Sequence, residues 1–412
     1  MEPKIRLKGF SGNWETRRVG ELCDVLTGFP FEGSKILPKG KELLMRGINI
    51  TEGYIRHSDE IDRYFDEDAS SLSKYRLQKN DLVIGMDGSK VGKNSALVTD
   101  KEVNSLLVQR VARLRNDNPH LIHLIQIALG SGKFFEYIDS MKTSSAIPHI
   151  SPSDIKNFTL SISDNDEETK LVSEYFMHLD SLIQSTTKKI ESLKQVKVAS
   201  LQSLFPQEGE TIPRVRFNGF NGEWKTNPLN TFLTPSNLKN RDSKFTKEDV
   251  LSVSGEFGIV NQIAFQGRSF AGVSVANYGV VEHKDIVYTK SPLKTNPYGI
   301  IKTNEGEAGI VSTLYAVFKC SNDTNPTFVQ YYFDLDSRLN SYLRPLVRKG
   351  AKNDMKVSAK DALLGNVIFP TYEEQTVIAD YFSNLDSQIT LQTQRLEKLK
   401  QIKSACLDNM FV

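Results

Sequence analysis

The sequence predicts an α+β protein in which two mixed α/β domains alternate with two long helices, as one unit written twice. Two segments predict this, because each occurs twice and the number of residues between its two copies (the offset) is similar for both. The only two tryptophans lie in the same short phrase, Gly-Phe-x-Gly-x-Trp, at residues 9–14 and 219–224. The segment 167–205 aligns without a gap on 373–411, with about 17 of 39 positions identical. Both offsets are about half of the 412-residue length, so the repeat covers the whole chain.

The composition fits two domains of ordinary size, each with its own core. Hydrophobic residues make up 39% and charged residues 25% of the chain, as in soluble globular proteins. No apolar stretch approaches the ~20 residues of a membrane helix, and no signal-peptide pattern is evident. The three cysteines lack CxxC spacing, which argues against disulfides and zinc. We therefore expect a cytoplasmic protein without a metal site.

The first half contains two predicted strands followed by a helix. Alternating and β-branched residues predict the strands at Asp81–Met86 and Ser105–Arg115. Asn118-Pro119 then starts a helix over Leu121–Leu129, and Gly130 ends it. The second half repeats this order. Its elements are strands at Asp285–Tyr288 and Ser312–Lys319, a helix start at Asn325-Pro326 and a helix over Phe328–Leu335.

A strand is predicted to close each half before its long helix begins. These closing strands are Ile155–Ile162 and Leu363–Phe369. The expected organisation is a domain over residues 1–163, a helix over 164–206, a second domain over 207–370 and a second helix over 371–412. Gly-rich turns between the strands leave loops long enough to carry specificity.

The long helices are predicted because no Gly or Pro occurs from 167 to 205, and Pro206 ends that run. Apolar residues recur in both copies at steps of three and four, with polar breaks, as in a two-helix coiled-coil seam. The apolar seam positions are Ile183, Ile190, Leu193 and Leu204 in the first copy and Ile389, Leu396, Leu399 and Met410 in the second. We expect the two copies to pair antiparallel about a pseudo-two-fold axis; a single amphipathic surface helix is the alternative.

Local charge and helix length both favour a DNA partner. The net charge of +2 does not indicate one, but basic residues cluster once in each half, over Lys74–Arg115 and Arg338–Lys360. Such a run is about as often a solvated face as a polyanion-binding surface. A helix of this length spans roughly 58 Å, on the order of 17 base pairs. A rod carrying a domain at each end would suit a split DNA site with an unread gap.

The sequence lacks the motifs of a DNA enzyme. Asn296-Pro297-Tyr298 lacks the second proline of an Asn/Asp-Pro-Pro-Tyr/Phe methyltransferase motif, and we interpret it as a turn. Gly88–Lys93 resembles a phosphate loop, but its glycines are too close and Asn94 replaces the Ser or Thr. The paired carboxylates Glu167-Glu168 and Glu373-Glu374 start the helices, where they favourably meet the helix dipole. We therefore predict no catalytic residue in this chain.

Three features together identify a family. They are the duplicated Gly-Phe-x-Gly-x-Trp phrase, Ile147–Ser151 before Asp154-Ile155, and the twice-written Tyr-Phe-x-x-Leu-Asp-Ser of the helices. With them the chain resembles, over essentially its whole length, the specificity (S) subunits of type I restriction–modification systems. The second copy departs from the pattern, because Lys352–Met355 stands where the first copy has Ile147–His149. The loops before the last strand of each half are therefore expected to differ in function.

The resemblance implies a scaffold protein without a cofactor of its own. Each domain would be a target recognition domain that reads one half of an asymmetric bipartite site in double-stranded DNA, and the helices would fix the spacer. Two methyltransferase (M) and two restriction (R) subunits would bind it, bringing S-adenosylmethionine, ATP and magnesium for adenine methylation or DNA cleavage. We place M docking near Asp180 and Asp386. A stand-alone DNA methyltransferase or nuclease, or a coiled-coil adaptor without a DNA role, are the alternatives.

Candidate DNA contacts are basic residues in Gly-rich or basic loops. Arginine can bind a guanine edge through two hydrogen bonds, whereas lysine more often neutralises phosphate. The candidates are Arg46, Lys90 and Lys93 in the first half and Lys290, Lys294, Arg348, Lys349 and Lys352 in the second. A single basic residue of this kind is more often solvated surface than a base contact. Trp14 and Trp224 are expected to be packing anchors where each domain joins its helix, rather than platforms for bases.

Overall fold

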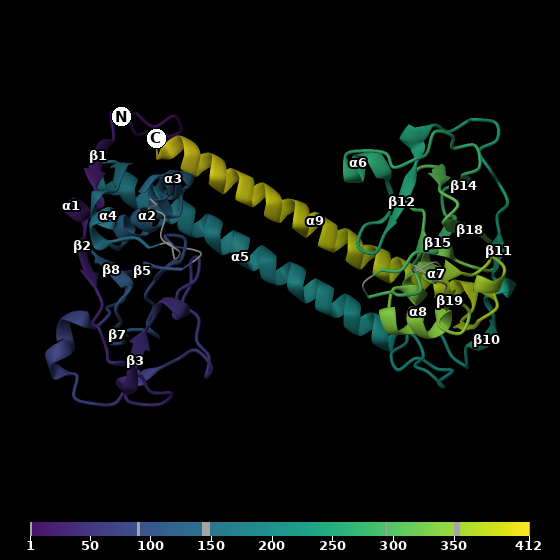
Figure 1. Ribbon diagram of the computed structural model, residues 1–412, viewed down its shortest axis with the longest axis horizontal. Coiled ribbons are helices and arrows are strands. Elements are labelled where there is room, and N and C mark those ends of the chain that lie inside the picture. Colours follow the sequence, from purple (N-terminus) through teal and green to yellow (C-terminus); the bar gives the residue numbers. More distant parts are fainter. Residues whose placement is uncertain (1, 89–90, 142–148, 294, 350–354, 412) are drawn as a thin grey trace. The chain divides into compact units, whose positions relative to one another are not determined.

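The computed structural model describes residues 2–88, 91–141, 149–293, 295–349 and 355–411 (Figure 1). The chain forms two compact units. Unit 1 contains Met1–Thr187 together with Gln394–Val412, and unit 2 contains Lys188–Thr393. Each unit therefore holds one domain, the start of one long helix and the end of the other. No helix in the described part of the chain is both long and apolar enough to cross a membrane.

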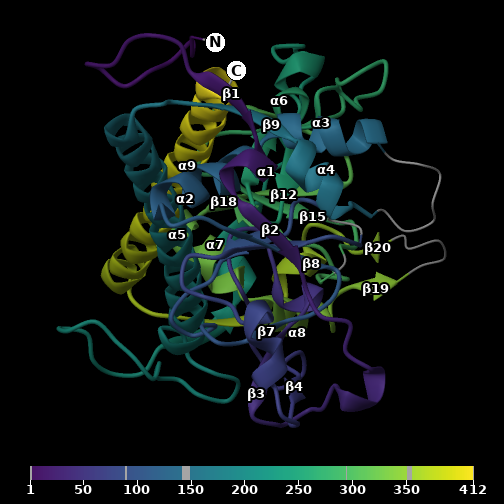
Figure 2. The same ribbon diagram turned by 90° about the vertical axis from the view of Figure 1, so that its left-hand side faces the viewer.

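The core of unit 1 is an antiparallel four-stranded sheet with helices packed on one face (Figure 2). The strand order is β2-β8-β5-β6. The elements are β2 (Asp24–Thr27), β8 (Val111–Arg115), β5 (Leu82–Gly85), β6 (Ser95–Leu97), α1 (Val19–Leu22), α2 (Pro119–Leu129) and α3 (Gly132–Met141). Successive residues of a strand face opposite sides. Leu82 and Ile84 accordingly join the cluster of α2, whereas Val83 joins a second cluster on the other face.

A smaller sheet of unit 1 contributes to that second cluster. It has the order β4-β3-β7, with β3 (Glu42–Met45) antiparallel to β4 (Tyr64–Phe65) and parallel to β7 (Leu106–Leu107). The prediction of one strand over Ser105–Arg115 was therefore wrong, since this stretch is divided between β7 and β8. Arg110 lies between them with φ +68°, so the chain turns there and the two strands enter different sheets.

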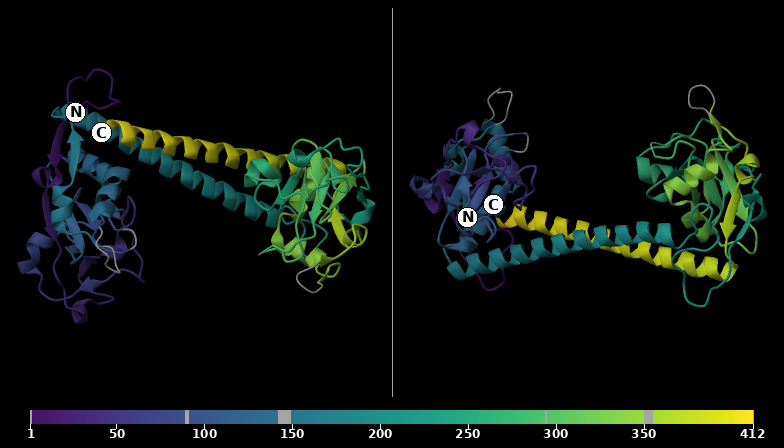
Figure 3. Two further views of the ribbon diagram at one scale, coloured as in Figure 1. Left: turned by 45° about the horizontal axis from the view of Figure 1, so that its top comes forward. Right: turned by 90° about the horizontal axis from the view of Figure 1, so that it is seen from below.

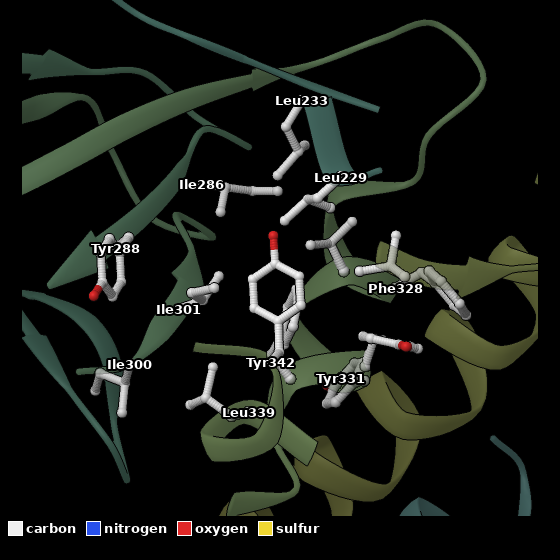
Figure 4. Packing of buried hydrophobic residues seen from close by; sticks show 14 of the residues in the cluster. Leu229, Leu233, Ile286, Tyr288, Ile300, Ile301, Phe328, Tyr331, Leu339 and Tyr342 are labelled. Carbon is white, nitrogen blue, oxygen red and sulfur yellow. The ribbon is translucent and has the colours of Figure 1, made fainter. Parts of the chain in front are cut away.

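Unit 2 repeats the four-stranded sheet in the order β11-β18-β15-β16. The elements are β11 (Leu233–Pro235), β18 (Tyr315–Cys320), β15 (Ile286–Thr289), β16 (Ile301–Thr303), α7 (Pro326–Phe333) and α8 (Asp336–Leu343). Figure 4 shows Tyr288, Phe328 and Tyr342 in its core, where all three are buried. The strand predicted from Ser312 begins later, because residues 312–314 form a turn.

The capping signals of α2 and α7 act as the sequence predicts. The Asn118 side chain accepts hydrogen bonds from the backbone N–H groups of the first turn of α2, and Asn325 does the same for α7. The other elements of unit 2 are β12 (Leu251–Ser254), β13 (Gly258–Asn261), α6 (Gln262–Gln266), β14 (Gly279–Val281), β17 (Gly309–Val311), β19 (Arg348–Lys349) and β20 (Met355–Lys356).

The closing strands are shorter than predicted. The β9 strand (Thr159–Ile162) pairs with β1 (Glu15–Arg18), and β21 (Asn366–Phe369) pairs with β10 (Lys225–Pro228). The prediction failed over the first residues of Ile155–Ile162, which belong to α4 (Pro152–Asn157). Ser151 and Asp154 form a capping box there, which favours a helical turn over a strand. Leu363 likewise ends a short 3-10 turn rather than starting a strand.

The long helices are α5 (Asp166–Ser203) and α9 (Tyr372–Met410), which Figure 3 shows side by side in both views. In unit 1 Asp180 and Tyr175 of α5 contact Lys403 and Cys406 of α9. Residue numbers thus rise along one helix as they fall along the other, and the contacts of unit 2 run the same way. The helices therefore pair antiparallel within each unit. Every predicted seam position is buried or half-buried.

Candidate nucleic-acid interface

The same ion pair joins each domain to its helix, through an arginine just before each repeated phrase. In unit 1 the Arg6 guanidinium donates two 2.7 Å hydrogen bonds to the carboxylate of Glu168. In unit 2 Arg216 binds Glu374 with the same two distances. Both carboxylates are buried, so the second glutamate of each pair does more than meet the helix dipole. Burial raises the pKa of Glu168, but hydrogen bonds from Arg6 and Ser163 outweigh it and hold the pKa below its usual value.

The tryptophans of the repeated phrases are packed at the same junctions. Trp14 lies 5.8 Å from the Phe411 ring, and Trp224 lies 6.2 Å from Phe205, the repeat equivalent of Phe411. Each indole is only 3% exposed, so neither ring can stack on a base. The Trp14 Nε1 donates to Glu168, whereas the Nε1 of Trp224 has no hydrogen-bond partner in the described part of the chain.

Several polar residues meet at the end of β5 in unit 1. Arg46 directly follows β3. Gly47 after it lies beside Asp87, since a Cβ added there would stand 3.9 Å from Oδ1 of Asp87. Asp87 accepts a 3.0 Å hydrogen bond from Arg110 and forms an isolated bridge with His149. The sequence-based candidate Arg46 therefore lies close to Arg110, which sequence reasoning did not select. The Gln109-Arg110 break in the predicted strand was the available signal.

Lys93 is the other described candidate of unit 1. Its Nζ lies 4.8 Å from the centroid of the Phe135 ring on α3, so the ammonium group is held on an aromatic face. Gly92 before it has φ +77°, and an added Cβ would stand 3.1 Å from the Phe134 ring. Lys90 lies outside the described residues, as do Ile147 and Pro148 of the segment Ile147–Ser151.

The candidates of unit 2 follow the corresponding strands. Lys290 directly follows β15, as Met86 follows β5. Arg348 is exposed on β19, opposite Lys356 on β20, and Lys349 lies on the same strand. Lys294 and Lys352 lie outside the described residues.

The predicted basic runs are partly internal rather than a continuous surface. Arg338 packs on the rings of Phe205 and Tyr332 and donates to the carbonyl oxygen of Tyr332 at 2.9 Å. In unit 1 Arg115 binds the buried carboxylate of Asp81 at 2.6 Å. These guanidinium groups stabilise the fold, as does Arg113, which is 3% exposed and binds Asp24, so neither run forms a continuous basic surface.

The two aspartates predicted at the docking surface are engaged within the chain. Asp180 accepts a 2.5 Å hydrogen bond from Lys403, and Asp386 accepts a 2.8 Å bond from Lys197. Asp386 also accepts from the hydroxyl of Tyr331. Since these pairs join α5 to α9, charge reversal at either aspartate would disturb the helix pair as well as any partner surface.

The fold and its junctions define a protein of two repeated α+β domains, each mounted on paired antiparallel helices. Residues 11–195 match the family model of the type I restriction modification DNA specificity domain. Residues 11–195 therefore carry this specificity domain, in agreement with the resemblance of the sequence motifs to that family.

The chain is also similar to one known protein in sequence and to solved structures in fold. The chain is 28% identical over 191 residues to the EcoAI specificity subunit of a type I restriction enzyme from Escherichia coli, a match that covers 46% of this chain and 31% of the relative. It thus spans about a third of that protein. The fold is similar to the crystal structure of a type I restriction–modification S subunit from M. genitalium, with a TM-score of 0.59, 17% identity and coverage of 100% and 99% of the two chains. A Thermoanaerobacter tengcongensis HsdS subunit superposes at a TM-score of 0.43, with 14% identity and 97% coverage of both chains.

Proposed function

We propose that this chain is the DNA-recognition subunit of a type I restriction–modification complex. Each domain reads one half of a bipartite asymmetric site in double-stranded DNA. The observation that carries the proposal is the duplication of a whole reading unit, with the same sheet order and the same Arg–Glu junction in both copies. Two similar units with diverged loops suit two related but different half-sites.

We further propose that catalysis belongs to partner chains. Two M subunits with S-adenosylmethionine would methylate adenine, and two R subunits with ATP and magnesium would cleave DNA. The length of helix between the two units would set the spacer. The matched family model supports this assignment, because it describes a domain for specificity.

The M subunits are proposed to dock on the outward faces of α5 and α9, near Asp180 and Asp386. Val196 and Ile402 are repeat equivalents, 45% and 37% exposed. Each directly precedes the lysine that pairs with one of those aspartates. An exposed apolar side chain beside a satisfied ion pair is a suitable contact for a partner protein.

Mapping methylated adenines across a genome tests the proposal. Cells that carry the M subunit with this chain should show methylation at one split sequence, and cells that carry the M subunit alone should show none. Replacement of the first domain by that of another S subunit should change only one half of the sequence. Methylation that is independent of this chain would contradict the proposal, as would purified chain that methylates or cuts DNA by itself.

A further inference from the structure

Each unit carries a β-hairpin at the same place in its topology. In unit 1 a short hairpin, closed by the antiparallel bridge between Ile50 and Ile55, follows β3, which runs parallel to β7. In unit 2 the β12–β13 hairpin follows Val250, which forms a parallel bridge with Ile310 of β17. The unit 1 hairpin lies against β6, where Gly53 N donates to Ser95 O at 2.9 Å, and β13 lies beside β16. Because β6 and β16 hold equivalent positions in the two sheets, the hairpins are equivalent too.

The turn of each hairpin presents an aromatic side chain to solvent. We call residues 51–54 tip 1 and residues 254–257 tip 2. Tyr54 is 60% exposed at tip 1, and Phe257 is 59% exposed at tip 2. The tip sequences, Thr-Glu-Gly-Tyr and Ser-Gly-Glu-Phe, do not align residue for residue. An exposed aromatic has therefore been kept at the same place in two diverged copies, although exposed rings of this size are unfavourable in water.

Both tips are held in shape by local hydrogen bonds. In tip 1 the hydroxyl and the backbone N–H of Thr51 both donate to the carbonyl oxygen of Tyr54, at 2.7 and 3.0 Å. In tip 2 the Ser254 hydroxyl accepts from the backbone N–H of Phe257 at 3.1 Å. Gly53 and Gly258 supply the positive φ that each turn requires. Such order lowers the entropy cost of inserting the aromatic ring into a binding partner.

Each aromatic residue has an arginine and a glutamate near it in the sequence. At tip 1 Arg56 is exposed, and its Nε donates to the carbonyl oxygen of Ile48 at 2.8 Å. At tip 2 Phe257 contacts Phe265, and Arg268 lies nearby in the chain over the exposed Phe270 ring. Each tip also carries one exposed glutamate, Glu52 or Glu256. A carboxylate opposes contact with phosphate, but it accepts a hydrogen bond from the amino group of cytosine. In the major groove arginine binds the edge of guanine, and an aromatic side chain makes apolar contact with the methyl group of thymine.

We propose that tip 1 and tip 2 enter a groove of duplex DNA and contact bases, with Tyr54 and Phe257 as specificity-determining residues of the two half-sites. This rests on the proposed function, because it names the part of each domain that reads its half-site. The tips differ from the lysine-rich loops at the ends of β5 and β15, which are suited to phosphate. If the tips contact bases, truncation of Tyr54 or Phe257 should lower the affinity for the target. The number of counterions released on DNA binding should stay the same.

The test uses the full chain bound to its M subunits and duplex oligonucleotides that carry the methylation-mapped target. Tyr54→Ala and Phe257→Ala should each weaken binding of the target about tenfold, while binding of a scrambled duplex and the slope of log affinity against log salt stay unchanged. Tyr54→Phe and Phe257→Tyr should keep most of the affinity. Leu364→Ala, at a residue that is 56% exposed outside the tips, is the matched control and should bind as the parent does.

The half-site at which a variant loses discrimination between bases is the one that its tip reads. Base changes in one half of the target should cost less affinity in Tyr54→Ala than in the parent, and base changes in the other half should cost less in Phe257→Ala. Unchanged target affinity in both variants would overturn the inference. So would an equal loss on target and scrambled duplex with a smaller salt slope, which indicates phosphate contact, or loss of M subunits with retained DNA binding. Failure of the parent complex to bind any duplex would instead contradict the proposed function.

Discussion

Lys197 on α5 donates to Asp386 on α9 at 2.8 Å in unit 2, and the same pairing recurs in unit 1 between Lys403 and Asp180, their repeat equivalents. Next to these pairs the hydroxyl of Ser200 lies 2.9 Å from that of Tyr381, and Cys406 occupies the equivalent place beside Tyr175. The duplication therefore extends from the sequence to individual contacts between the helices.

The Lys197–Asp386 pair is expected to stabilise the helix pair measurably. Lys197→Asp should lower the free energy of unfolding, and adding Asp386→Lys should recover part of the loss because the charges are again complementary. We expect a coupling free energy of about 1 kcal/mol, since both side chains are partly exposed. Urea unfolding of the two single variants and the double variant measures it. The exposed Glu397–Lys400 pair within α9 is the control and should show a smaller coupling. Additive effects of Lys197→Asp and Asp386→Lys would contradict the prediction.

The junction of unit 1 predicts a dependence of stability on pH. The pKa of Glu168 is below its ordinary value in the folded state, so the folded protein binds this proton more weakly than the unfolded chain. Its contribution to stability is present above the unfolded pKa, near 4.3, and is lost as the pH falls through the folded pKa. Unfolding in urea from pH 6 to pH 3 should therefore show a smaller loss of stability in Glu168→Gln than in the parent. An equal loss would show that Glu168 does not titrate with folding.

The proposed docking surface predicts a change in subunit stoichiometry. Val196→Glu and Ile402→Glu each place a charge on one of two equivalent exposed positions, so each variant should retain one M subunit and the double variant none. Mass measurement of the purified complexes counts the subunits. Gln195→Glu and Gln401→Glu, at the neighbouring exposed positions, introduce the same charge and should retain both. Two retained M subunits in the double variant would place docking elsewhere.

The sequence predicted those parts of the fold that depend on local signals. The cap at Asn118-Pro119 started a helix, and the apolar run at Leu82–Gly85 formed a central strand, as expected. The seam positions of the long helices could be predicted because their period of three and four residues is visible without knowledge of the partner. All of them are buried or half-buried.

Long-range pairing was not predictable in the same way. Nothing local to Glu168 shows that its partner is Arg6, 162 residues away. Charge composition also could not show that Arg338 packs on aromatic rings while Arg348 remains exposed, because both lie in the same basic run. The equivalence of Tyr54 and Phe257 could not be predicted for a related reason. The two tips occupy equivalent positions in the sheet topology, but their sequences do not align.

The contacts of the chain ends predict that the protein tolerates circular permutation. Ile5 N donates to Asn409 O at 3.2 Å in unit 1, and Val215 N donates to Ser203 O at 3.0 Å in unit 2. The second pair is joined by continuous chain, so the first pair can be joined too, by a linker of about four residues. A permuted chain opened between Gln207 and Glu210 should fold with unchanged helix content in circular dichroism. Loss of cooperative unfolding would show that the continuous link at residues 204–214 is required.

The helix contacts also predict that the first half can pair with itself. A fragment of residues 1–206 contains α5 but lacks α9, and α5 carries both partners of the repeated ion pair, Asp180 and Lys197. A second copy of α5 can therefore replace α9, with Asp180 of each copy facing Lys197 of the other. Light scattering should show a dimer, which with M subunits should methylate a palindromic site made of one half-site and its inverted copy. Asp180→Lys should weaken the dimer, and Asp180→Lys with Lys197→Asp should restore it. A fragment that stays monomeric at micromolar concentration would show that α5 cannot stand in for α9.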